Sequence, residues 1–149
     1  MPKIKALHHS ASKGNFGMVS ELLEHIPIDS KEAQFGWTPL HLAARNGELK
    51  TILLLIYSGA KLEERDIHKE TALHIACFKG NLAAVELLLR MGAKRKKNLD
   101  GEVASEVSEK YGHFACAELV RKFWRKSKRE KMEASCWHKD NRRMVSCKD

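Results

Sequence analysis

The stretch TPLHLAARNGELKTILLLIYSGA, residues 38–60, returns in closely similar form as TALHIACFKGNLAAVELLLRMGA at residues 71–93. The two copies begin 33 residues apart. A fixed period of roughly 20–50 residues is typical of a solenoid, in which each unit buries its apolar face against its neighbours. The repeat therefore decides the fold class.

The same spacing extends the repeat toward both ends of the chain. A Leu-His pair stands at residues 7–8, 40–41 and 73–74, and glycine stands at residues 14, 47, 80 and 112. The last step is one residue shorter than the others. The spacing predicts four units, over residues 3–34, 35–67, 68–99 and 100–124. Because the first and last units are degenerate, we expect the stack to be complete.

Each unit reads as two short helices joined by a turn. Thr38 is suited to cap a helix, and Pro39 is suited to its first position, where a missing N–H costs nothing. Gly47 ends this helix in a turn. The second helix, residues 49–56, is apolar around most of its circumference and must be covered on more than one side. Gly59 follows it, as a terminating glycine commonly does.

TPLHLAARNG and TALHIACFKG are similar to the ankyrin-repeat signature, and 33 residues is that family's period. The resemblance covers about residues 3–124. It implies an all-α solenoid of about four helix-turn-helix units with hairpin loops, and a module that binds another protein without chemistry of its own. It also implies that the repeated histidines are structural, each hydrogen-bonding a neighbouring turn.

The resemblance further implies where a partner would bind, because ankyrin proteins usually use their hairpin loops and the exposed face of the first helices. By register these positions are Phe35, Trp37, Arg45, Asn46, Ile67, His68, Glu70, Phe78, Lys79, Leu99, Asp100, Lys110 and Tyr111. Four of them are aromatic, and aromatic side chains often anchor interfaces. The alternative is that Phe35 and Trp37 merely fold over and shield their own hairpin.

The fourth unit departs from the motif and leads into a basic tail. Ser105 and Glu106 replace the Leu-His pair, Arg121 replaces an apolar residue, and Trp124 stands where the terminating glycine is expected. Polar substitutions suit a capping repeat. Without that glycine, the last helix is predicted to run on. Residues 1–120 hold 16 Lys/Arg and 15 Asp/Glu, whereas residues 121–149 hold 11 and 4.

We therefore divide the chain into a repeat domain, residues 1–124, and a basic tail, residues 125–149, helical at first and then disordered. The basic residues of this extension begin with Arg121, Lys122, Arg125, Lys126, Lys128 and Arg129. Basic amphipathic helices bind calmodulin, nucleic acid or anionic membranes. The plainer interpretation is a solvated extension in which Phe123 and Trp124 pack on the last repeat.

A second basic stretch, KRKK at residues 94–97, resembles a nuclear-import signal. By register, Lys96 and Lys97 stand beside Glu63 and Glu64 of the preceding hairpin. The alternative interpretation is therefore a cross-repeat charge ladder, whose exposed pairs are worth roughly 0–1 kcal/mol each.

No motif indicates catalysis, a cofactor or a metal. Cys77 and Cys116 stand at small-residue positions of the repeat, so buried thiols are expected there. Cys136, His138 and Cys147 match no common zinc spacing. The cysteines form no CxxC pair, and the N-terminus has no signal-peptide pattern.

We expect a monomeric protein of the cytoplasm or nucleus, neither secreted nor transmembrane. The function that the sequence favours is recognition of a partner protein through the concave ankyrin surface. The alternative is a nuclear or nucleic-acid-associated regulatory factor that uses the basic tail.

Overall fold

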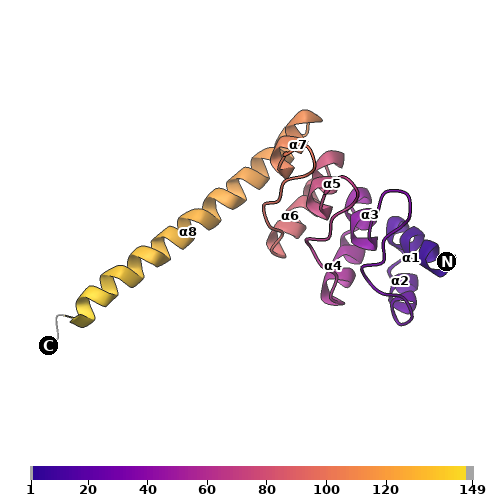
Figure 1. The fold of residues 1–149 in the computed structure, drawn as a ribbon, viewed down its shortest axis with the longest axis horizontal. Helices are drawn as coiled ribbons and strands as arrows, with labels where there is room; N and C mark the ends of the chain where they lie inside the picture. The colour runs from indigo at the N-terminus through magenta and orange to yellow at the C-terminus, as the bar shows by residue number, and fades with distance from the viewer. Residues whose placement is uncertain (1, 147–149) are drawn as a thin grey trace.

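The computed structural model describes the backbone of residues 2–146 and the side chains of residues 2–133. Eight helices and no strand occur in this part of the chain (Figure 1). The helices are α1 (Pro2–Lys13), α2 (Phe16–Leu23), α3 (Pro39–Asn46), α4 (Leu49–Tyr57), α5 (Ala72–Lys79), α6 (Leu82–Arg90), α7 (Ala104–Lys110) and α8 (Phe114–Ser146).

The helices stack in two rows (Figure 1). In one row α1, α3, α5 and α7 contact one another in order, and in the other α2, α4, α6 and the start of α8 do the same. Each helix also contacts its partner within the unit. The predicted all-α solenoid of four helix-turn-helix units is confirmed.

The helix ends form as the sequence predicts. Thr38 is the N-cap of α3, with its side-chain oxygen accepting from the backbone N–H of His41 at 3.4 Å, and Pro39 is the first helical residue. Gly47 ends α3 with φ of 71°, a left-handed conformation that glycine adopts at little cost. Gly80 ends α5 in the same way.

The repeated histidines join each unit to the next. Each Nε2 lies within hydrogen-bonding distance of a backbone carbonyl oxygen in the following hairpin: His8 to Trp37 at 2.9 Å, His41 to Glu70 at 3.0 Å and His74 to Glu102 at 3.2 Å. The structural role expected for these histidines is confirmed. Burial lowers the pKa of His41 and of His74.

The core lies between the two rows and runs through all four units. Leu7, Ile52, Leu88 and Val120, one from each unit, are fully buried. Cys77 and Cys116 are buried free thiols, as expected. Burial raises the pKa of Cys77 to about 12.

The fourth unit closes the stack with substituted chemistry. Glu106 stands at the motif histidine's position, and its carboxylate accepts from the backbone N–H of Val103 at 2.8 Å. A carboxylate thus replaces an imidazole in capping α7. Arg121 forms an ion pair with Glu109 of the same unit. Ser105 is buried, so it does not contribute to a polar outer face.

Helix α8 runs to Ser146 and projects away from the stack (Figure 1). The last helix continues beyond Trp124, as the missing glycine predicts. The backbone is also helical over residues 134–146, which belong to the stretch 133–149 that the sequence predicts to be disordered. No glycine or proline follows Gly112 in the sequence, so no helix breaker interrupts the segment. Residues 147–149 lie outside the described residues.

Candidate functional site

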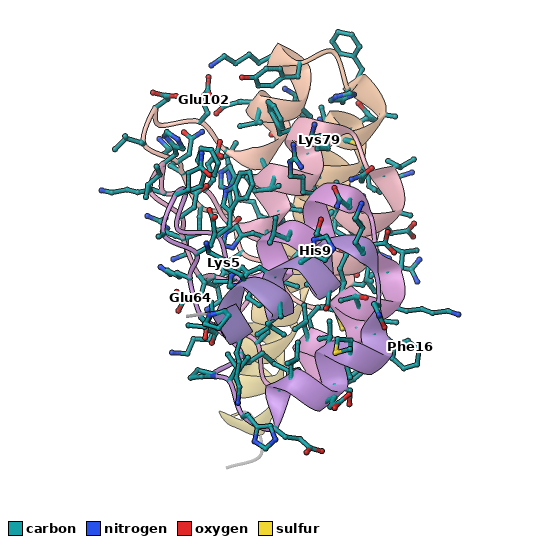
Figure 2. The ribbon with its side chains drawn as sticks, turned by 90° about the vertical axis from the view of Figure 1, so that its right-hand side faces the viewer. Lys5, His9, Phe16, Glu64, Lys79 and Glu102 are labelled. Atoms are coloured by element: carbon teal, nitrogen blue, oxygen red, sulfur yellow. The ribbon has the colours of Figure 1, made fainter. Side chains whose placement is uncertain are left out.

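An open groove of about 390 Å³ lies between the hairpin loops and the first-row helices. It is lined by Phe35, Trp37, Arg45, Asp66, His68, Glu70, Ile75, Phe78, Asn98, Leu99, Asp100 and Tyr111. Figure 2 shows the hairpins with Glu64 and Glu102 on one side of the stack and Phe16 of the second row on the opposite side. We call the hollow between the hairpin loops and the first-row helices the groove.

Two aromatic pairs stand in the groove. The rings of Phe35 and Trp37 stack with centroids 4.7 Å apart and an interplanar angle of 27°. Phe78 and Tyr111 meet edge to face, with centroids 4.5 Å apart. Both geometries are favourable for aromatic pairs. The rings therefore hold one another in place before any partner arrives.

Trp37 is also fixed by the next hairpin. Its indole N–H donates to Asp66 Oδ2 at 3.0 Å. The other carboxylate oxygen of Asp66 accepts from the backbone N–H groups of His68 and Glu70, both at 2.9 Å. Trp37 thus packs on Phe35 of its own hairpin, is held by the next hairpin, and lines the groove.

The next hairpin repeats this turn with an amide. Asn98 Oδ1 accepts from the backbone N–H of Asp100 at 3.1 Å and of Glu102 at 2.9 Å. Sequence reasoning missed Asp66 and Asn98 as groove residues, and it missed Ile75. The signal was present, because Asp66 and Asn98 occupy the same repeat position and Asp and Asn commonly cap such turns.

Nine of the thirteen predicted partner-binding residues line the groove, and four do not. Asn46 donates its amide to the carbonyl oxygen of Ser12 at 2.6 Å, so it ties α3 to α1 instead. Lys79 lies over the Phe78 ring, with Nζ 5.6 Å from the ring centroid. Ile67 is 56% exposed but outside the groove, and Lys110 pairs with Glu102.

Carboxylates in and beside the groove differ in their surroundings. Partial burial, and then the nearby charge of Asp66, raise the pKa of Glu70. A hydrogen bond from Lys110 lowers the pKa of Glu102. Among the described residues, the Glu102 carboxylate is therefore paired with the Lys110 ammonium, whereas the Glu70 carboxylate has no Lys or Arg partner.

A second hollow, the basic cleft, lies between the 92–95 loop and α8 and encloses about 570 Å³. Its cations are Lys94, Arg95, Lys128 and Lys131. Phe123 and Trp124 form an apolar wall, and the Arg95 guanidinium lies 5.8 Å from the Trp124 ring centroid. Both aromatic residues also pack against the core, as the plainer interpretation of the tail expected.

The charge ladder predicted for KRKK is wrong. Glu64 forms its ion pair with Lys31 at 3.2 Å, and Glu63 accepts from the backbone N–H of Lys94 at 2.8 Å. Within the described residues, neither Lys96 nor Lys97 pairs with these carboxylates. The carboxylate of Glu63 binds the backbone and not a lysine side chain, because the 94–97 loop directs the N–H of Lys94 toward it.

The six predicted tail residues spread around α8. Lys122, Arg125, Lys126 and Arg129 line one side together with Glu118, Glu130 and Glu133, and Lys126 lies 3.9 Å from Glu130. Arg121, Arg125 and Lys128 line a hollow that they share with Arg95, so Arg125 borders both hollows. The basic residues thus form no single uninterrupted face.

Over the described side chains, no group of three His, Cys, Asp or Glu residues is placed to hold a metal. Cys136, His138 and Cys147 lie outside those side chains. None of the described helices combines the length and the apolarity that crossing a membrane requires.

Comparison with known families agrees with this architecture. A sequence model for ankyrin repeats in three copies matches residues 2–66, and one for ankyrin repeats in many copies matches residues 46–89. The chain belongs to the ankyrin-repeat family. Repeats of this class are generally non-enzymatic modules for protein–protein interaction. α7 and α8 lie beyond the matched residues, and their packing continues the stack.

Proposed function

We propose that this chain binds a partner protein through the groove. The observation that carries the proposal is the pair of aromatic contacts, Phe35 with Trp37 and Phe78 with Tyr111, set across an open hollow. Buried aromatic anchors dominate many interfaces, and truncating the best of them costs about 2 kcal/mol or more. No enzymatic role is proposed, because binding a partner protein requires no catalytic group.

The groove is suited to an extended segment of the partner. Its walls come from three successive hairpins and from the first-row helices, so a segment lying along it would cross several units. The aromatic rings are already positioned by neighbouring residues, so little ordering entropy remains to oppose binding. The volume of about 390 Å³ accommodates a few side chains rather than a folded element.

The test is affinity capture from cell extract, read by mass spectrometry, with matched variants. Phe78→Ala and Tyr111→Ala should lose the partner. Phe114→Ala and Tyr57→Ala remove rings that are 69% and 78% exposed away from the groove, and they should retain it. Thermal melts establish that each variant is folded. Equal recovery by all four variants would exclude the groove as the binding surface.

The basic cleft supports a second candidate, binding of nucleic acid. Lys94, Arg95, Lys128 and Lys131 gather there, and none belongs to an ion pair within the described residues. Phosphate-driven binding weakens steeply with salt, with a slope of about −0.9 per phosphate contacted on duplex DNA. A labelled DNA duplex titrated at several salt concentrations measures that slope.

The test variants for the cleft are Lys94→Gln and Lys128→Gln. The control is Lys50→Gln, which changes an exposed lysine of α4. The first two should each reduce the slope by about one. Binding instead to anionic vesicles, or to calmodulin only when calcium is present, would assign the basic residues to the other partners considered for the tail. Binding to none of these would leave the tail as a solvated extension.

A further inference from the structure

Two positions of the repeat are paired in successive units, one on the hairpin and one near the end of the first helix. In the second unit these are Trp37 and Arg45, and the guanidinium lies 5.6 Å from the indole ring centroid. In the fourth unit they are Glu102 and Lys110, and the ammonium lies 3.1 Å from the carboxylate. In both units the helix supplies a cation to the hairpin residue.

The third unit breaks this arrangement. The corresponding residues are Glu70 and Phe78, a carboxylate and a phenyl ring, and both line the groove. Within the described residues, no Lys or Arg forms an ion pair with Glu70. The middle of the groove therefore lacks the cation that the units on both sides provide.

The surroundings of Glu70 favour a cation from outside. Glu70, Asp66 and Asp100 line the groove against one arginine, Arg45, so its net charge is negative. The Asp66 oxygens accept from the Trp37 indole and from backbone N–H groups, and Arg45 lies over the Trp37 ring. The pKa of Glu70 is raised by partial burial and by Asp66. The nearby charge of His68, and then a hydrogen bond from the Asn98 side chain, act against this shift.

We propose, on the basis of the proposed function, that the centre of the groove binds a lysine or arginine side chain of the partner segment. The cationic head lies at Glu70, and the aliphatic stem runs between the Phe35–Trp37 pair and the Phe78–Tyr111 pair. Such stems bury well against aromatic rings while the head keeps its charge. Ring faces attract cations as well, so the aromatic walls and the carboxylate act in the same direction.

The probe is a library of random peptides of about 12 residues displayed on phage, long enough to cross the groove at ~3.3 Å per residue. The full chain is the bait. Peptides that Phe78→Ala no longer binds are taken as groove ligands. We expect these peptides to share a Lys or Arg at one position.

One selected peptide is then synthesised together with its mate in which the shared basic residue is Gln. The wild type should bind the basic peptide about tenfold or more tightly than the mate, as expected for a charge-assisted hydrogen bond. Glu70→Gln should remove this difference, because the carboxylate is its source. Glu86→Gln, at an exposed carboxylate of α6, should preserve it.

Phe78→Lys supplies a second test of the proposed cation site, one that keeps the Glu70 carboxylate in place. It places a lysine opposite Glu70, as Lys110 stands opposite Glu102, and it should compete with the peptide's basic residue while the fold remains intact. Thermal melts check the fold. The binding advantage of the basic peptide over its Gln mate should disappear in this variant.

The outcomes separate this inference from the proposed function. Groove peptides that share no basic residue, or that bind Glu70→Gln as tightly as wild type, overturn the inference but leave the groove as a protein-binding site. A library that yields no peptide sensitive to Phe78→Ala overturns both.

Discussion

The imidazole of His41 lies 3.0 Å from the backbone carbonyl oxygen of Glu70, so a residue of one repeat positions a groove residue of the next. Nδ1 of His41 accepts from the backbone N–H of Thr38 at 3.1 Å, which leaves Nε2 as the donor to Glu70. The same neutral imidazole therefore caps its own helix and holds the following hairpin. Stability and groove shape depend on the same bond.

The stability of the fold should fall as pH falls below neutrality. Burial lowers the pKa of His41 and His74 below the unfolded value of 6.5. Between the two values the unfolded chain binds more protons than the native one, so acid favours unfolding. Urea denaturation at pH 7.5, 6.5 and 5.5 measures this. His41→Gln/His74→Gln should be less stable at pH 7.5 and should show a weaker pH dependence.

Glu70 acts with the opposite sign, but in a lower window. Its native pKa is raised above the unfolded value of 4.5, so its contribution favours the folded chain as pH falls toward that value. The range from pH 7.5 to 5.5 therefore reports mainly on the histidines. A stability that stays constant, or rises, over that range would contradict the neutral-imidazole arrangement.

Trp37→Phe should destabilise the fold although the ring remains apolar. The indole N–H is the donor to Asp66 Oδ2, and Asp66 is only 7% exposed. Leaving a buried acceptor without its partner costs about 1–3 kcal/mol. Tyr57→Phe is the matched control, since it removes a polar group from a ring that is 78% exposed. Chemical denaturation of both variants gives the comparison, and equal losses would mean that the bond to Asp66 contributes little.

The sequence was sufficient to predict the fold because the repeat period specifies which residues share a position. The same register placed Phe35, Trp37, Phe78 and Tyr111 on one surface. It could not show which side chains turn into the groove, because that depends on rotamers and on contacts between units. Asn46 has the right position, but its amide reaches back to Ser12.

The basic cleft was beyond sequence reasoning for a related reason. Lys94 and Lys128 are far apart in the chain, and they come together only because α8 packs beside α6. Two basic stretches that read as separate signals thus form one surface. The prediction that Lys96 and Lys97 pair with Glu63 and Glu64 was wrong. The repeat register specifies which hairpins are neighbours, but it does not specify which charged side chains form pairs.

Leu88→Ala should cost about 2–5 kcal/mol of unfolding free energy, because Leu88 is fully buried in the core between the two rows. Leu82→Ala changes the same side chain on the same helix at a position that is 44% exposed, so it should cost much less. Urea denaturation with a common slope compares the two. Similar losses at both positions would contradict the assignment of the core.

Gly80→Ala should destabilise the fold more than Gly112→Ala, although the two glycines end equivalent helices. Both have positive φ, 71° and 79°, so each substitution costs roughly 1–2 kcal/mol of backbone strain. A Cβ at Gly80 would also collide with the His113 ring, whereas nothing lies within 4 Å of one at Gly112. Thermal melts rank the two variants. The reverse order would indicate that His113 moves aside freely.

Cys77 should resist alkylation in the native protein. Its thiol is fully buried, and burial raises its pKa to about 12. At pH 8 the thiolate fraction is then about one part in ten thousand, and the thiolate is the species that reacts. Iodoacetamide treatment followed by peptide mass mapping measures the labelling of each cysteine separately. The Cys77 peptide should remain unlabelled in buffer and become labelled in guanidinium chloride, where the repeat stack is unfolded. Labelling in buffer at the rate of the denatured chain would mean that the fourth unit undocks readily, because Ser108 of α7 and Cys116 of α8 are the groups that lie near this thiol.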